Sequence, residues 1–315
     1  NPYNDEEIAR VPLGNSDTID AAISAAANAF AKTRSMPAHV RTSILQNVVR
    51  GIEARRAEFA ETIVTEAGKP VVYAEVEVAR AIATFTLAAE EARRWNAESG
   101  GLVAMDAFAS GEGHLGVHRR FPIGVISALT PFNFPLNLVA HKVAPCLATG
   151  NTMVVKPAPK TPLTALLLAE VLVEAGIPAG QVNVITCANE DAPQLVQDER
   201  VKMVSFTGSP AVGWKLKGMS GRKKIALELG GNAGVIVEAD ADLDAAIPMI
   251  ASGSFAYAGQ TCISVQRIFV ADGIYDDFKS RLVAFVRERV KSGDPRERDT
   301  VIGPIVSADA LERTQ

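Results

Sequence analysis

Hydrophobic residues recur at a helical spacing through the first third of the chain. Residues 17–32 repeat alanine and isoleucine every three to four positions, which predicts an amphipathic helix. A second run, residues 39–67, ends at Gly68, and a third covers residues 71–95. The apolar face of the second run carries Ile44, Val48, Ile52 and Phe59. We therefore expect residues 1–98 to form a helical N-terminal part.

Glycines interrupt this pattern in the segment ESGGLVAMDAFASGEGHLG, residues 98–116. They predict a β-hairpin at about residues 100–120. His114 and His118 share one of its expected strands, but their spacing alone does not predict a metal pair. No metal site is expected.

From residue 123 onward, short β-branched runs alternate with amphipathic helices. The expected strands are residues 123–129, 151–156, 181–186, 203–206 and 224–228. The clearest helix covers residues 161–175, with Thr161 as its N-cap and Pro162 at its first position. This alternation predicts the α/β class: a doubly wound, Rossmann-like sheet at residues 121–233, which binds ligands at the carboxyl ends of its strands. The same pattern restarts after Ala233 and predicts a second α/β domain from residue 234.

Composition narrows the function classes. The 315 residues carry 32 basic and 36 acidic side chains, a formal net charge of −4, so no nucleic acid or anionic membrane partner is expected. No apolar run reaches the roughly 20 residues of a membrane span, and the expected location is the cytoplasm. Cys146, Cys187 and Cys262 are well separated and predict neither a disulfide framework nor a zinc site.

Three segments contain residues that could bind a ligand or a reacting group. The strand before Gly208 and Ser209 runs into a turn that opens a helix, where backbone amides can face a pyrophosphate. The G-x-x-x-x-G spacing of Gly208 and Gly213 is no dinucleotide fingerprint, so a purely structural turn is the alternative. Lys156 ends another strand, where it is either a ribose or phosphate ligand or a surface lysine. Asn133, between aromatic residues and prolines, is either an oxyanion donor or part of an Asx-type turn.

Glu228 and Cys262 are candidate catalytic residues. Glu228 ends an apolar strand before two glycines, which suits a general base. Cys262 is expected near the start of a helix, whose dipole favours the thiolate. Cys146 and Cys187 have apolar neighbours and are expected to be inert.

Five motifs occur in the order of one known enzyme family. TPFNFP, ATGNTMVVKP, FTGS, LELGGN and GQTC follow one another, and EAGKP occurs in the helical part. On these motifs the whole chain closely resembles the aldehyde dehydrogenase superfamily. The resemblance implies oxidation of a small-molecule aldehyde with NAD or NADP through a thiohemiacetal and a thioester on a cysteine.

The resemblance implies a role for each matching residue. Cys262 matches the nucleophile, and Asn133 matches the oxyanion asparagine, which acts with the Cys262 backbone amide. Glu228 matches the general base that activates water, and Lys142 matches a lysine that relays protons. Lys156 matches the lysine at the adenosine ribose. The other expected cofactor-binding residues are Thr130, Pro131, Phe132, Pro159, Lys160, Phe206, Thr207, Gly208, Ser209, Val212, Leu229 and Gly230; Phe132 also takes the place of an aromatic at the substrate tunnel.

Two departures from the family pattern change the expectations. Many NAD-preferring relatives carry a glutamate where this chain has Pro159, followed by Lys160, so NADP is also allowed. The chain stops at Gln315, before an E-x-F-G-P motif and a final oligomerisation strand. We therefore expect residues 234–315 to be the first part of a catalytic domain in a C-terminally incomplete chain, inactive when isolated.

Alternatives and partners follow from the same resemblance. Glu228 favours hydrolysis; the alternatives are a CoA-acylating enzyme and a non-catalytic structural or binding member of the fold. The hairpin is expected to pair subunits into a homodimer or homotetramer. No residue placed in the tunnel is clearly cationic, but Arg119 and Arg120 would provide a cation if the hairpin folds toward it, so an anionic semialdehyde is allowed.

Overall fold

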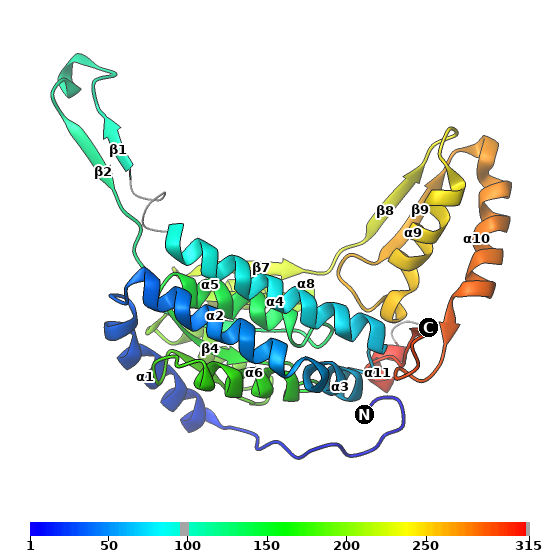
Figure 1. Cartoon of the computed structure of the whole chain (residues 1–315), viewed down its shortest axis with the longest axis horizontal. Helices are drawn as coiled ribbons and strands as arrows, with labels where there is room; N and C mark the ends of the chain where they lie inside the picture. Colours follow the sequence, from blue (N-terminus) through cyan, green and yellow to red (C-terminus); the bar gives the residue numbers. More distant parts are fainter. Residues whose placement is uncertain (95–100, 313–315) are drawn as a thin grey trace.

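Five parallel strands form the central sheet of the protein (Figure 1). The computed structural model describes residues 1–94 and 101–312. The strands are β3 (Val125–Leu129), β4 (Thr152–Lys156), β5 (Val182–Val184), β6 (Val201–Gly208) and β7 (Lys224–Leu229). Their order is β5-β4-β3-β6-β7, and every neighbouring pair is parallel. The expected doubly wound α/β sheet is confirmed.

Helices precede the sheet and connect its strands. They are α1 (Ser16–Thr33), α2 (Ala38–Ala54), α3 (Arg56–Ala67), α4 (Val71–Arg94), α5 (Asn137–Ala148), α6 (Leu163–Glu174), α7 (Ala192–Gln197) and α8 (Pro210–Met219). The run expected at residues 39–67 forms two helices, because Arg55, with φ −105° and ψ 20°, leaves the helical conformation between them. Trp95, the expected end of the third run, lies outside the described residues.

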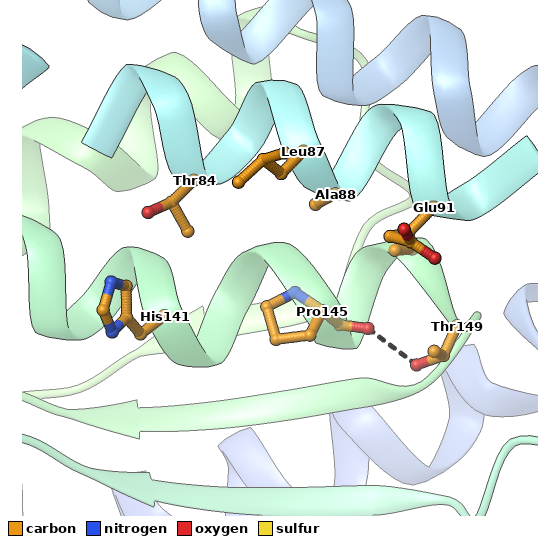
Figure 2. A pocket seen from close by; sticks show the side chains of 8 residues that line it. Thr84, Leu87, Ala88, Glu91, His141, Pro145 and Thr149 are labelled. Carbon is orange, nitrogen blue, oxygen red and sulfur yellow. Dashed lines mark hydrogen bonds between the residues drawn. The ribbon is translucent and has the colours of Figure 1, made fainter. Parts of the chain in front are cut away.

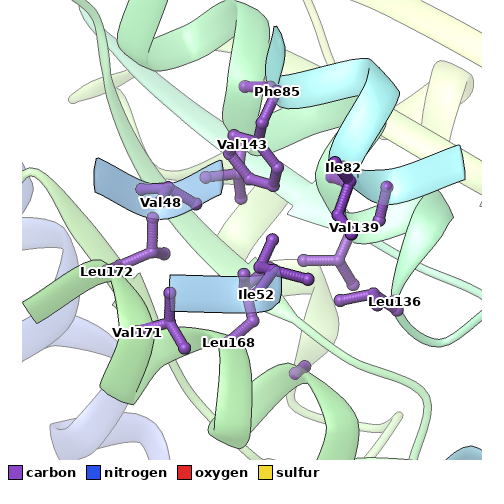
Figure 3. Packing of buried hydrophobic residues seen from close by; sticks show 14 of the residues in the cluster. Val48, Ile52, Ile82, Phe85, Leu136, Val139, Val143, Leu168, Val171 and Leu172 are labelled. Atoms are coloured by element: carbon purple, nitrogen blue, oxygen red, sulfur yellow. The ribbon is translucent and has the colours of Figure 1, made fainter. Parts of the chain in front are cut away.

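Helices cover both faces of the sheet. Ile126 and Ala128 of β3 face a core built with α5 and α6, against which α2, α3 and α4 pack (Figure 3). Val125 and Leu129 alternate to the other face and contact α1, α7 and α8. Both faces are therefore dry, which explains why the strands read as continuous apolar runs.

Two smaller sheets flank this body. The hairpin of β1 (Gly101–Ala104) and β2 (Leu115–His118) is antiparallel and projects away from it (Figure 1). On the other side, β8 (Ala233–Val237) and β9 (Val265–Val270) pair in parallel beside α9 (Leu243–Phe255) and α10 (Tyr275–Arg289). The remaining elements are η1 (Ala109–Gly111), η2 (Ala256–Gly259), η3 (Asp272–Ile274), β10 (Lys291–Ser292), β11 (Thr300–Ile302) and α11 (Ala308–Glu312). The domain boundary at residue 233 stays a prediction. Within residues 1–94 and 101–312, none of the helices has the length and apolar character that crossing a membrane requires.

Buried glutamates cap two of the sheet helices. The carboxylate of Glu66 in α3 accepts from the backbone amides of Leu163 and Thr164 at 2.7 and 3.0 Å, at the start of α6. The carboxylate of Glu77 in α4 accepts from Leu136 and Asn137 at 2.9 and 3.0 Å, at the start of α5. Each cap satisfies amides that a helix leaves without partners.

The N-cap expected at Thr161 is wrong. Helix α6 begins at Leu163 with Pro162 in the cap position, and the Pro162 side chain cannot accept a hydrogen bond. Thr161 is buried and donates through its hydroxyl to the Phe132 carbonyl at 3.4 Å. The capping acceptor comes from Glu66, 97 positions away from Leu163, and local sequence signals do not report such a distant partner.

We expect the Glu66 cap to make stability depend on pH. Burial raises the pKa of Glu66 from 4.5 to about 7, so the folded protein binds this proton more tightly than the unfolded chain. The contribution is fully present below about pH 4.5 and is lost as the pH rises through 7, by on the order of 3 kcal/mol. Urea unfolding of wild type and Glu66→Gln, from pH 4.5 to 8, measures it. Equal pH slopes in the two proteins would contradict the expectation.

Candidate active site

The strand order changes direction between β3 and β6, and ligands bind at such switch points in doubly wound sheets. The turn after β3 contains Thr130, Pro131, Phe132 and Asn133, and it leads into α5, which carries Lys142. The strand β6 ends in Phe206, Thr207 and Gly208. The fold therefore brings the candidate residues of these two segments to one edge of the sheet.

Asn133 connects this edge to the segment that carries Cys262. Its side-chain amide nitrogen donates to the backbone oxygen of Gln260 at 2.9 Å. Its carbonyl oxygen Oδ1 is buried and makes no hydrogen bond among the described residues. Two segments 127 residues apart in the chain are thus held together two positions before the candidate nucleophile.

Cys262 lies in an exposed turn between η2 and β9. The expectation that it lies near the start of a helix is wrong, because the chain passes from this turn directly into the strand β9. Cys146 and Cys187 are buried, and burial raises the pKa of each thiol. Of the three cysteines, Cys262 alone is accessible.

The turn of the cysteine is anchored from several sides. The side-chain oxygen of Gln260 accepts from the Val306 amide at 3.0 Å, and its nitrogen donates to the carbonyls of Tyr257 and Pro304 at 3.3 and 3.2 Å. Tyr257 and Ala258 have φ values of 54° and 56°, a left-handed conformation that surrounding contacts must hold.

Glu228 approaches this turn through the glycines that follow it. Glu228 is exposed at the end of β7, where it pairs in register with Thr207. A Cβ on Gly231 would lie 3.3 Å from the Cys262 carbonyl oxygen, so the two turns are in close contact. The sequence pointed to Gly230 but not to Gly231, whose importance depends on a contact 31 positions away.

Lys142 faces the same edge from α5. Its ammonium donates to the hydroxyls of Ser205 and Thr207 at 3.0 and 2.9 Å. Burial lowers the pKa of Lys142 to about 8, against the opposing charge of Glu228, which raises it. This lysine therefore changes protonation near neutral pH.

Lys156 ends β4 and is buried, with its ammonium donating to the Asn189 side chain at 2.9 Å. Burial lowers its pKa, and Cys187 and Glu190 nearby raise it. The Thr130 amide donates to the Lys156 carbonyl at 3.1 Å, and the Thr130 hydroxyl is buried with no partner among the described residues. The alternative that Lys156 is a surface lysine is wrong.

The turn after β6 opens α8 as expected. Ser209 is the N-cap, and its side chain accepts from the Val212 amide at 3.4 Å. A Cβ on Gly208 would lie 2.5 Å from the Phe206 ring, so a larger residue does not fit this turn. The partly buried Leu229 packs against the cluster that contains Phe206. Pro210 has no backbone N–H and the Val212 amide donates to Ser209, so of the first three residues of α8 only Ala211 offers an amide to an anion.

The other predicted residues lie around this edge. Pro131 and Phe132 are half-buried in the turn after β3, and Pro159, Lys160 and Gly230 are exposed. Arg119 and Arg120 follow the projecting hairpin, which extends away from the sheet (Figure 1). The hairpin therefore does not fold toward the candidate site, which was the condition for Arg119 and Arg120 to reach the substrate.

Arg80 is a cation that the sequence did not point to. Its guanidinium lies 5.7 Å from the centre of the Phe134 ring, next to Asn133, and it forms no ion pair with any described residue. It occupies an ordinary exposed position of the amphipathic helix α4, and only the packing of α4 on α5 brings it to the site.

A cavity of about 470 Å³ lies between α4 and α5 (Figure 2). Thr84, Leu87, Pro145 and Thr149 line it, together with His141. None of the predicted catalytic residues lines this cavity. It is therefore separate from the candidate site, which is an open edge of the sheet.

Comparisons with known proteins agree on one family. The sequence profile of the aldehyde dehydrogenase family matches residues 1–315. The chain is 38% identical to 3-sulfolactaldehyde dehydrogenase of Priestia aryabhattai, over its whole length and 65% of that protein. It is 37% identical to the NADP(+) succinate-semialdehyde dehydrogenase of Escherichia coli, over its whole length and 64% of that protein. The structure of aldehyde dehydrogenase 21 from Physcomitrella patens, in complex with the reaction product succinate, superposes with a TM-score of 0.95 at 42% identity, over 99% of this chain and 64% of that one. The chain spans less than two thirds of these three proteins, and residues 1–315 belong to the aldehyde dehydrogenase family.

Proposed function

We propose that this chain is part of an NAD(P)-dependent aldehyde dehydrogenase that oxidises an aldehyde to the free carboxylic acid. The observation that carries the proposal is the hydrogen bond from Asn133 to the Gln260 carbonyl. It holds an amide donor beside the turn of the accessible thiol Cys262, while the Glu228 segment contacts the same turn through Gly231.

The Cys262 thiolate attacks the aldehyde carbon, and the carbonyl oxygen becomes an alkoxide. The second hydrogen of the Asn133 amide and the Cys262 backbone amide stabilise this charge as it develops. Losing one such donor costs about 10²- to 10³-fold in rate. Because Asn133 is already held by Gln260, its orientation is set before the substrate binds.

NAD or NADP, when bound, would accept a hydride from the thiohemiacetal, which would leave a thioester on Cys262. Glu228 then removes a proton from water, which attacks the thioester carbon and releases the acid. Lys142, with a pKa of about 8, can hold or release a proton at this edge, and its ammonium is oriented by donating to the hydroxyls of Ser205 and Thr207.

The residues present fit a dinucleotide. A buried ammonium at Lys156, the Thr130 hydroxyl with no partner among the described residues, and the turn that opens α8 lie at the carboxyl edge of the sheet. Lys156 and Thr130 would hold the adenosine ribose, and the Gly208–Ser209 turn would hold the pyrophosphate. Pro159 provides no carboxylate to repel a 2′-phosphate, and Lys160 is exposed beside it, so both NAD and NADP fit.

The substrate we propose is an aldehyde with an anionic tail. Arg80 places a cation beside the ring that follows Asn133. Relatives are named for 3-sulfolactaldehyde, aspartate semialdehyde and succinate semialdehyde, all of which carry an acidic group. A CoA-acylating enzyme is disfavoured because Glu228 provides a base for hydrolysis, and a scaffold has no need for an accessible Cys262 beside an amide donor.

Glu228→Gln separates the two half-reactions. In the natural protein that contains this chain, mixing aldehyde and cofactor should give a burst of reduced cofactor equal to the sites, while steady turnover falls by about 10²- to 10⁴-fold. The burst survives because acylation does not use the base. Stopped-flow absorbance measures both phases, with Cys262→Ser as the control that abolishes them. A lost burst in Glu228→Gln would place this residue in acylation instead.

Pro159→Glu should shift the enzyme toward NAD. A carboxylate near the ribose repels a 2′-phosphate, and we expect kcat/KM for NADP to fall on the order of tenfold at low salt while that for NAD changes little. Pro159→Gln, of the same size but uncharged, is the matched control. If both variants lose NADP equally, shape rather than charge determines the preference.

Arg80→Leu should discriminate between anionic and neutral aldehydes. Loss of a charge-assisted contact should lower kcat/KM for a four-carbon aldehyde ending in a carboxylate by about 10- to 100-fold. The rate with butanal should stay within about threefold, since it makes no such contact. Equal losses on both substrates would show that Arg80 supports only the fold around Phe134.

A further inference from the structure

The EAGKP motif contains a buried cation with no role in the proposed chemistry. The Lys69 ammonium forms an ion pair with the Glu77 carboxylate, and the two side chains are 1% and 0% exposed. Burial of a pair this deep costs solvation of both charges, and further hydrogen bonds must offset it. The amides of Leu136 and Asn137 provide them to Glu77.

Two aromatic rings complete the surroundings of Lys69. Its ammonium lies 3.8 Å from the centre of the Phe134 ring and 4.8 Å from that of Tyr257. A cation over a ring face in a dry site is an attractive contact. Lys69 therefore joins two rings from segments that are far apart in the chain.

Those two segments carry the candidate catalytic groups. Phe134 directly follows Asn133, and Tyr257 begins the left-handed turn that leads to Gln260 and Cys262. The Tyr257 hydroxyl donates to the Ala67 carbonyl at 2.9 Å, so the side chain is held by its hydroxyl as well as by the contact of its ring with Lys69. These contacts account for a non-glycine residue that keeps a φ of 54°.

We propose that Lys69 is a positioning residue for acylation, which rests on the proposed function. Its ammonium, held by Glu77 between Phe134 and Tyr257, fixes the Asn133 turn against the turn of Cys262. The side-chain amide and the backbone amide then face the same developing oxyanion. Lys69 itself does not contact the reacting atoms.

The test compares Lys69→Met, Lys69→Arg and Glu66→Gln in the natural protein that contains this chain. Glu66 is the matched control, because it also caps a helix from the core, but its carboxylate accepts from Leu163 and Thr164 of α6 rather than from the segment of Phe134. In Lys69→Met the single-turnover rate of cofactor reduction should fall on the order of 10- to 100-fold. KM for the aldehyde and steady deacylation should change by less than about threefold. Lys69→Arg, which retains the cation, should recover most of the rate.

Amide hydrogen exchange supplies a readout that needs no activity. In Lys69→Met, exchange in residues 131–137 and 256–262 should accelerate together, whereas Glu66→Gln should leave both unchanged. If wild type reduces neither cofactor, the proposed function fails, and this comparison alone decides whether Lys69 joins the two segments. Loosening of one segment only, or an acylation rate no lower than in Glu66→Gln, would overturn the proposal.

A double variant covers the case in which Lys69→Met does not fold because Glu77 is left as an unpaired buried charge. Lys69→Met with Glu77→Gln removes both charges together. A folded double variant with slow acylation and two loosened segments supports the proposal. If the double variant also fails to fold, Lys69 serves the fold alone and the proposal is overturned.

Discussion

Burial of two carboxylates fixes the relation between the N-terminal helices and the central sheet. Glu66 and Glu77 lie in a dry core, where a carboxylate must find donors or lose its charge. The donors are the first amides of α6 and α5, which those helices leave without intrahelical partners. Each glutamate therefore accepts from backbone amides that its helix leaves without partners, and those amides stabilise the buried carboxylate. The start of α5 cannot move relative to α4 without removing both amide donors from a buried oxygen of Glu77.

The difference between the two glutamates shows what the site requires. Glu66 faces only neutral donors, and its pKa rises to about 7, so at neutral pH this cap is partly protonated. Glu77 has Lys69 beside it, and Lys69 also contacts rings of the segments that carry Asn133 and Cys262. Helix α5, which follows the Asn133 turn, is capped by Glu77, which is ion-paired with Lys69. Helix α6, which carries no predicted catalytic residue, is capped by Glu66, which accepts only from neutral donors.

Local signals predicted the sheet well and the site geometry less well. The five strands and the apolar helix faces follow from periods of two and 3.6 residues, which each segment carries by itself. The N-cap of α6 and the position of Cys262 were wrong, because Glu66 replaces a local cap and because the chain enters β9 without a helix. Arg80 and Gly231 gave no local signal at all, since each matters only through a contact with a distant segment. The roles of Cys262, Glu228 and Asn133 stay predictions that rest on ordered motifs, and the structure adds two contacts between their segments, Asn133 with Gln260 and Gly231 with the Cys262 carbonyl oxygen.

The site is assembled from turns rather than from regular elements, so its precision must come from elsewhere. Asn133, Gly231 and Cys262 lie on three turns that follow different strands or helices, and turns are the parts of a fold that open most readily. Two of these turns are tied to other parts of the chain: that of Asn133 by Gln260, and that of Cys262 through Gln260 to Val306 and through Tyr257 to Ala67 and Lys69. The turn of Gly231 lies against the Cys262 carbonyl oxygen. Left-handed residues at Tyr257 and Ala258 persist because these contacts over-determine them. An exposed thiol can thus be held in a defined position without being buried, because Tyr257 and Gln260, which precede it, are anchored to other segments of the chain.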